Sequence, residues 1–181
     1  MPSVLTHAAV AVAGGIALAP REVPHHFWPL AILCATVADA DVLGFSFDIP
    51  YHHFFGHRGF FHSPFWGLLL SLCLTAVFFR DVRVFSAPWG FYFFFFFFLA
   101  ASHGILDALT DGGLGIALLS PFDNQRHFFP WTPIQVAPLR VEAFFSPRGW
   151  SVFKSELLWI WLPAFMLLGL ARIIRMVVAR H

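Results

Sequence analysis

Apolar residues occupy five long segments of the chain, which cover residues 4–19, 27–45, 64–79, 87–106 and 157–179. A helix that crosses the hydrocarbon core of a bilayer needs about 20 residues, with a range of about 17 to 25, so the first and third segments are short. The alternation of apolar and polar residues that predicts membrane β-strands is not seen in the sequence. The pattern therefore predicts an all-α integral membrane helical bundle with four to five transmembrane helices.

The composition agrees with a membrane location. Of the 181 residues, 59% are hydrophobic and only 12% are charged, whereas about 25% of a soluble domain is charged. Because no linker-like stretch divides the chain, we expect a single membrane-embedded domain over residues 1–181, with the lipid bilayer as a partner. The net charge of +1 offers no basic surface, so no nucleic acid is expected as a partner. The oligomeric state is left open.

The first apolar segment needs to be distinguished from a signal peptide. Its sequence Ala-Leu-Ala at 17–19 resembles a cleavage site, but no Lys or Arg precedes the segment and Pro20 follows the potential cut. We therefore expect a retained helix. Cys34 and Cys73 lie in apolar segments without the spacing of metal ligands, and both are expected to be small buried side chains.

Ionisable residues converge on one side of the membrane when the apolar segments are threaded back and forth across it. We call this the site side. The His and Asp residues that reach it come from four segments and are His7, Asp39, Asp41, His57, His62, His103 and Asp107. An ionisable group at membrane depth costs about 2.5–3.5 kcal/mol, so a cluster of them indicates a site. A long, partly ordered loop region at about residues 110–155 is expected on the same side.

Arginines mark the opposite side of the predicted bundle. They lie in short connections or near helix ends and are Arg21, Arg80, Arg83, Arg172, Arg175 and Arg180. Positive residues in such places favour the cytoplasm. The site is therefore expected to face outward, and the C-terminus of this multi-pass protein is expected to be cytoplasmic.

Each pair of site-side residues has an ordinary interpretation beside the chemical one. His103 and Asp107, at i and i+4 of a helix, share one face and can bind a metal or simply hydrogen-bond to each other. The block HRGFFHS places His57 and His62 in a turn, with Gly59 allowing tight backbone geometry. This spacing alone is weak evidence for a metal site.

The remaining candidates strengthen the case for a cation. Asp39 and Asp41 lie at the end of an apolar segment, where two carboxylates repel each other unless a positive group lies between them. His7 is alone in its apolar segment, so it is either a metal ligand or a hydrogen-bonding partner of a neighbouring helix. Together, imidazole and carboxylate groups suit zinc, manganese or iron.

The expected cofactor is therefore a divalent metal, one or two ions, with zinc favoured over manganese or iron. Because the set exceeds what one tetrahedral zinc requires, some members are expected to orient the ligands. The candidate catalytic residues are Asp41 as a base, His62, and Arg126, which with Arg58 could hold a phosphate. Asp111 lies in a glycine turn and is expected to be a cap or an orienting group.

Several motifs, taken in order, resemble the YdjM/DUF457 family of bacterial inner-membrane proteins. They are Thr6-His7, Asp39-x-Asp41, HRGFFHS, His103-xxx-Asp107 and LLSPFDNQRHF. The family is described as membrane-bound metal-dependent hydrolases, which implies a metal site and hydrolysis here. The resemblance covers about residues 3–135 and leaves the C-terminal transmembrane helix at 156–181 outside it. Phe61 stands where the commoner form of the central block has Thr. The His-xxx-Asp step is also similar to the ligand spacing of zinc-dependent phospholipase C and P1-type nucleases.

Four classes of function follow from these observations. The first is hydrolysis of a phosphoester or other bond in a lipid-type substrate, by metal-activated water at the outer interface. The second is metal or proton transport, which the clustering at one depth disfavours. The third is a haem bundle, which the aspartates fit poorly. The fourth is a structural or regulatory protein whose metal staples the helices.

Overall fold

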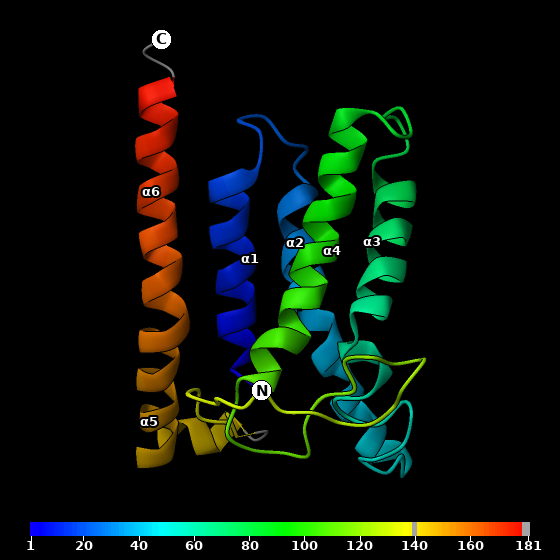
Figure 1. The fold of residues 1–181 in the computed structure, drawn as a ribbon, viewed down its shortest axis with the longest axis vertical. Coiled ribbons are helices and arrows are strands. Elements are labelled where there is room, and N and C mark those ends of the chain that lie inside the picture. Colours follow the sequence, from blue (N-terminus) through cyan, green and yellow to red (C-terminus); the bar gives the residue numbers. More distant parts are fainter. Residues whose placement is uncertain (139–140, 179–181) are drawn as a thin grey trace.

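The computed structural model describes residues 1–138 and 141–178, so Arg180 lies outside the described residues. Four helices form the bundle, and a fifth rod, made by α5 and α6, stands along its edge beside α1 (Figure 1). The bundle helices are α1 (Val4–Leu18), α2 (Phe27–Thr36), α3 (Pro64–Phe78) and α4 (Ala87–Ala108). Within the described ranges there are helices, turns and isolated bridges without strands, which confirms the all-α prediction.

Three helical stretches are long and apolar enough to cross a membrane: Phe27–Phe47, Ala87–Ala108 and Pro147–Val177. The helices α1 and α3 are apolar but have 15 residues each. At about 1.5 Å per residue such a helix is roughly 22 Å long, short of the roughly 30 Å hydrocarbon core. The predicted count of four to five transmembrane helices is therefore not confirmed: three qualify and two more are short.

Serine and proline define where the helices begin. Ser63 accepts a hydrogen bond from the amide of Trp66 at 3.1 Å, and Pro64 follows it as the first residue of α3. Ser86 and Ser146 cap α4 and α5 in the same way, each with a proline in the first turn. A capping hydroxyl satisfies a helix amide that has no partner within the helix.

The core is aromatic and lies between α2, α3 and α4. Phe27 on α2 is fully buried and its ring packs against those of Phe95 and Phe96 in the phenylalanine run of α4. Phe94 and Phe98 of the same run are exposed, on the surface that faces lipid. The phenylalanines therefore serve both as helix-packing residues and as a lipid-facing surface.

The arginine end of the bundle lies opposite the N-terminus (Figure 1). Arg175 on α6 donates hydrogen bonds to the carbonyl oxygens of Ala17 and Ala19 at 2.8 and 2.9 Å, so α6 ends beside the α1–α2 connection. The threading predicted that Arg21 and Arg175 lie on the same side of the bundle, but it did not predict this contact. Cys34 is buried as expected, but the expectation for Cys73 is wrong, because its side chain is exposed on α3.

The opposite end is built from 3₁₀ turns and loops. α2 continues as the 3₁₀ helix η1 (Val37–Phe47), and a shorter one, η2 (Phe60–His62), precedes α3. Beyond α4 the chain includes η3 (Val141–Phe145), α5 (Pro147–Glu156), the π-helical turn η4 (Leu157–Trp161) and α6 (Leu162–Val178). The loop region expected to reach about residue 155 ends at Pro147, because the cap Ser146 begins a helix whose polar first turns hide it from a hydropathy pattern.

Candidate metal centre

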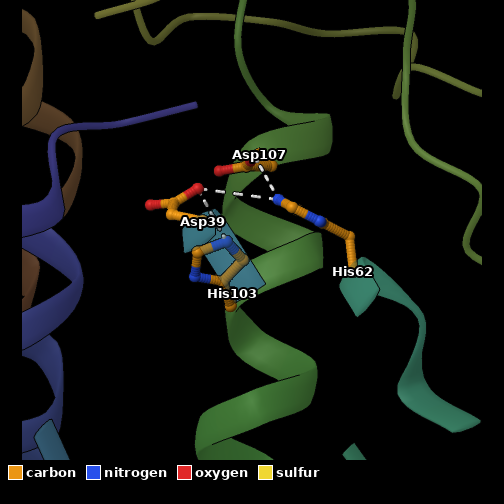
Figure 2. A group of neighbouring side chains, drawn as sticks. All are labelled: Asp39, His62, His103 and Asp107. Atoms are coloured by element: carbon orange, nitrogen blue, oxygen red, sulfur yellow. Dashed lines mark ion pairs between the residues drawn. The ribbon is translucent and has the colours of Figure 1, made fainter. Parts of the chain in front are cut away.

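Four buried side chains meet at the end of the bundle that carries the N-terminus (Figure 2). Each can offer one ligand atom, and these atoms lie within 4.8 Å of one another. His103 Nε2 lies 3.3 Å from Asp39 Oδ1, and His62 Nε2 lies 3.6 Å from the same oxygen and 3.5 Å from Asp107 Oδ2. Asp39 comes from η1, His62 from η2, and the other two from α4. Three elements distant in sequence thus build one cluster.

The α4 pair occupies one helix face, as the i, i+4 spacing predicts. Gly104 lies next to His103 and faces η2, where a Cβ atom would collide with the carbonyl oxygen of His62. The absence of a side chain at this position lets the η2 backbone approach α4 closely. This approach brings the His62 ring beside Asp107.

A hydrogen bond at Nδ1 of His103 determines that Nε2 is the nitrogen available to a metal. His103 Nδ1 lies 2.8 Å from the carbonyl oxygen of Ala35 at the end of α2. A carbonyl can only accept, so Nδ1 donates to it, and in the neutral imidazole Nε2 then keeps its lone pair. That lone pair is directed at the cluster, in the arrangement by which a backbone acceptor fixes the tautomer of a metal-binding histidine.

Asp41 holds the two histidines of the HRGFFHS block. Its Oδ1 pairs with His57 Nδ1 at 2.6 Å, while its Oδ2 accepts a hydrogen bond from the Arg58 amide at 3.1 Å and lies 3.1 Å from His62 Nδ1. Asp41, His57 and His62 form a second buried group with the composition of a metal site. His62 belongs to both groups, with Nδ1 facing one and Nε2 facing the other.

The electrostatic environment of His62 is dominated by carboxylates. Burial alone lowers the pKa of its imidazole, but interactions with Asp39 and Asp41 outweigh that effect and raise the pKa to about 9. A histidine in this environment attracts a positive charge, which either a proton or a metal ion can supply.

His7 joins the cluster from α1. Its ring stacks on that of His103 with centroids 3.9 Å apart, and its Nε2 lies 3.3 Å from Asp107 Oδ1. The direct stacking leaves no gap between these two rings for a porphyrin, which disfavours the haem alternative. The structure thus brings six of the seven predicted residues into two adjoining groups, and the seventh, His7, packs beside the larger one.

Several atoms of the larger group are buried without a hydrogen-bond partner. They are Nε2 of His7, His62 and His103 and both carboxylate oxygens of Asp39 and Asp107. Buried polar atoms in folded proteins are almost always paired, so a cluster of unpaired ones requires an explanation. A cation among Asp39, His62, His103 and Asp107 accounts for the unpaired atoms of these four residues at once. The donor set of imidazole and carboxylate therefore fits a divalent metal.

Arg58 is fully buried behind Asp107, a position that sequence reasoning missed. Its guanidinium donates to the carbonyl oxygen of Gly112 at 2.6 Å and to Thr110 Oγ1 at 3.1 Å, and its Nε lies 3.6 Å from Asp107 Oδ2. The sequence pattern suggested a loop arginine or a phosphate-binding group. Burial lowers the pKa of Arg58, while the Asp107 charge opposes the shift.

Arg126 contacts main-chain carbonyls close to the cluster. Its guanidinium donates to the carbonyl oxygens of His57 at 2.7 Å and Tyr51 at 2.6 Å, and it lies over the Tyr51 ring. These bonds fasten the loop that carries His57. Substrate contact by Arg126 stays a prediction. Asp111 accepts a hydrogen bond from the Val136 amide at 2.8 Å and so anchors the returning loop.

Glu156 is the second residue that sequence reasoning missed. Its buried carboxylate accepts hydrogen bonds from the amide and hydroxyl of Ser3 and, at 2.8 Å, from the hydroxyl of Thr6. The indole of Trp161 donates to the same Thr6 hydroxyl at 2.8 Å. Glu156 therefore ties the first turn of α1, which carries His7, to the end of α5. One acidic residue in a polar stretch gave no signal of this role.

The other histidines lie outside both groups. His53 and His127 are exposed, as are His25 and His52, and His26 is half-buried near the arginine end. These five of the ten histidines therefore take no part in either group. Composition alone could not separate them from the histidines of the two groups. His181 lies outside the described residues.

These features define a multi-helix membrane protein with a buried candidate metal centre at one end of its bundle. The chain belongs to the YdjM inner membrane protein family, whose sequence profile matches residues 1–179. The inner membrane protein YbcI of Escherichia coli strain K12 is 38% identical over 170 residues, which cover 94% of this chain and 96% of that relative. No solved structure matches the chain. The family match confirms the resemblance and the inner-membrane location, and it includes the last helix.

Proposed function

We propose that this protein is a metal-dependent hydrolase of the inner membrane that binds a divalent cation, zinc in the first instance, at its buried cluster. Asp39, His62, His103 and Asp107 would hold the ion. The observation that carries the proposal is the convergence of their ligand atoms within 4.8 Å, without hydrogen bonds to satisfy Asp39, Asp107 or the Nε2 atoms of the histidines.

Charge balance favours a single ion. Asp39, Asp41 and Asp107 bring three negative charges to the two groups, and the buried Arg58 brings one positive charge. The remainder of −2 equals the charge of one divalent cation. A second ion in the Asp41 group would require His62 to bind metal through both nitrogens. We therefore assign Asp41 to orienting His57 and His62, since both of its oxygens are already engaged.

A bound divalent metal would supply Lewis acidity and a water of lowered pKa, the means by which metallohydrolases attack phosphoesters. The chain's own residues prepare the site for it. Asp41 and the Ala35 carbonyl orient the two imidazoles, and Arg58 offsets the charge of Asp107. The preferred substrate is a phosphoester in a lipid-type molecule, because the cluster lies at one end of a membrane bundle.

Burial of all four ligands also supports a second candidate, a metal that only staples the helices, because structural sites are closed. A neighbouring cavity favours catalysis. Asp39 is among the residues that line this cavity of about 950 Å³. A purely structural site has no need of such a cavity.

The arginine distribution supports an outward-facing site. Arg21, Arg80 and Arg83 lie in the short connections at the end opposite the cluster, which the positive-inside rule assigns to the cytoplasm. An accessibility assay with a cysteine introduced at Asn124 tests this topology. Labelling from the periplasm is expected, and labelling only from the cytoplasm would overturn it.

Metal analysis of detergent-purified protein is the first test of the proposal. We expect about one divalent ion per chain in the wild type and a loss of most of it in His103→Ala and Asp107→Ala. His52→Ala, which removes an exposed histidine outside the cluster, is the matched control and should keep the metal. A wild-type protein without stoichiometric metal, or both cluster variants retaining it, would refute the assignment.

Catalysis needs its own measurement. The metal-loaded protein, incubated with bacterial lipid extract, is expected to release phosphate or a phosphorylated head group, and His103→Ala should not. Release by neither protein, with metal bound to the wild type, would favour the structural role.

A further inference from the structure

The residues that line the cavity beside the cluster indicate what kind of ligand it could bind. It lies between the first turn of α1, η1 and the segment of η3 and α5, and its volume is about 950 Å³. Sites for small organic ligands occupy about 300–1,000 Å³. Among the described residues of its lining, Asp39 is the one with a charged side chain, and the lining also includes Val4, Val42, Phe144 and Trp150.

The walls are suited to hydrocarbon. Water is held in protein cavities where it finds two to four polar partners. Apart from Asp39, Ser3 and Ser146, the described side chains around this space are apolar or aromatic. Trp150 and Phe153 contribute from α5, where Lys154 lies over the Trp150 ring at 5.5 Å. An apolar chamber with a cationic residue on its bordering helix suits a chain attached to an anionic group.

The position of Asp39 links this chamber to the candidate metal centre. Its Oδ1 faces Nε2 of both His62 and His103, while the residue also lines the cavity. A molecule lying in the chamber therefore ends beside the cluster. In a membrane protein the available molecules with a long apolar part and a polar end are lipids.

We infer that this cavity is a chain-binding subsite, which takes one hydrocarbon chain of an anionic lipid and sets the adjoining polar linkage next to Asp39. The inference rests on the proposed function for the fate of that linkage, but binding of the chain requires no turnover. It narrows the substrate class to amphiphiles with a chain long enough to fill the chamber.

Photo-crosslinking tests the subsite directly. The probe is phosphatidylglycerol with a diazirine in one acyl chain, incorporated with the full-length, metal-loaded protein into nanodiscs. Mass spectrometry should locate crosslinks on the peptides that contain Phe144, Trp150 and Phe153. Crosslinks spread evenly over exposed residues of α3 and α6, with none enriched here, would overturn the inference.

Two variants that fill the cavity make the test specific. Val42→Trp and Val4→Trp should reduce crosslinking at these peptides by about tenfold. Val77→Trp, the same change at an exposed position on α3, is the matched control and should leave it unchanged. Metal content is measured in every variant, so that a misfolded protein is recognised and set aside in favour of the other cavity variant. Unchanged crosslinking in a metal-loaded cavity variant would contradict the subsite.

Turnover separates this inference from the function on which it rests. Chain crosslinking in the cavity without hydrolysis of any lipid would leave the subsite standing and remove the hydrolase. Hydrolysis of lipid with crosslinks elsewhere would do the reverse. If both hold, Val42→Trp should lose activity on a long-chain lipid while retaining it on a short, water-soluble phosphoester.

Discussion

The carboxylate of Asp41 lies 3.1 Å from Nδ1 of His62, and the opposite nitrogen of the same ring faces Asp39 and Asp107. Replacing Asp41 by Asn keeps the shape but removes the negative charge that orients the ring. Loss of such an orienting carboxylate costs about 10–100-fold in metal affinity. Chelator competition should show this weakening in Asp41→Asn, with Asp48→Asn, at an exposed position of the same region, as the control. Equal affinities in the two variants would assign Asp41 no part in the site.

Gly104 controls the distance between η2 and α4, so Gly104→Ala should displace the His62 backbone. We expect a loss of metal and a lower melting temperature. Gly90→Ala on the same helix meets nothing within 4 Å and should be neutral or stabilising by up to about 1 kcal/mol, since alanine is the better helix former. Thermal melting and metal content of the pair provide the measurement, and identical behaviour would show that the close approach is dispensable.

Glu156 fastens the first turn of α1 through Ser3 and Thr6. In Glu156→Gln, an NH2 group, which can only donate, would replace one carboxylate oxygen and face the donors of Ser3 or Thr6. Hydrogen bonds to charged groups contribute about 1.5–3 kcal/mol each. The variant should therefore unfold at lower denaturant concentration than the wild type. Glu142→Gln, at an exposed position, should not. If both unfold with the wild type, the network adds nothing to stability.

Removal of the metal should destabilise the protein, because the two groups then retain three carboxylates, and among the described residues only Asp107 forms an ion pair with an arginine, Arg58. A ligand present at about 1,000 times its dissociation constant stabilises the folded state by about 4 kcal/mol. Chelation should lower the melting temperature of the wild type and restoration of zinc should raise it again. Asp107→Asn should respond to neither treatment; a chelator effect of equal size in this variant would mean that the ion binds elsewhere.

Much of the fold was predictable because a membrane helix appears in the sequence as a long apolar segment. The apolar segments 4–19, 64–79 and 87–106 match α1, α3 and α4 to within two residues, and the segment 27–45 covers α2 and most of η1. The i, i+4 spacing placed His103 and Asp107 on one face. α5 escaped because its capped first turns are polar and resemble a loop. A hydropathy pattern detects only residues that prefer lipid. The start of α5 is determined instead by the Ser146 cap and by packing, which such a pattern does not detect.

The site was predictable in membership but not in arrangement. Threading brought His7 and Asp39 to one side because sidedness follows from counting helices. The different contacts of the two Asp41 oxygens depend on side-chain geometry, which the spacing of residues in the sequence does not specify. Arg58 and Glu156 were missed for a related reason: a charged residue buried by long-range partners has the same local sequence as one that faces water.

The close approach of η2 to α4 at Gly104 has a consequence for biogenesis. The four candidate ligands are spread from Asp39 to Asp107, and two of them are on the last helix of the bundle to leave the ribosome. A nascent chain that has inserted only α1 to α3 lacks half of the donor set, so it cannot retain the ion. Metal loading would then follow completed insertion, and a stably bound cation would distinguish finished molecules from those still being assembled.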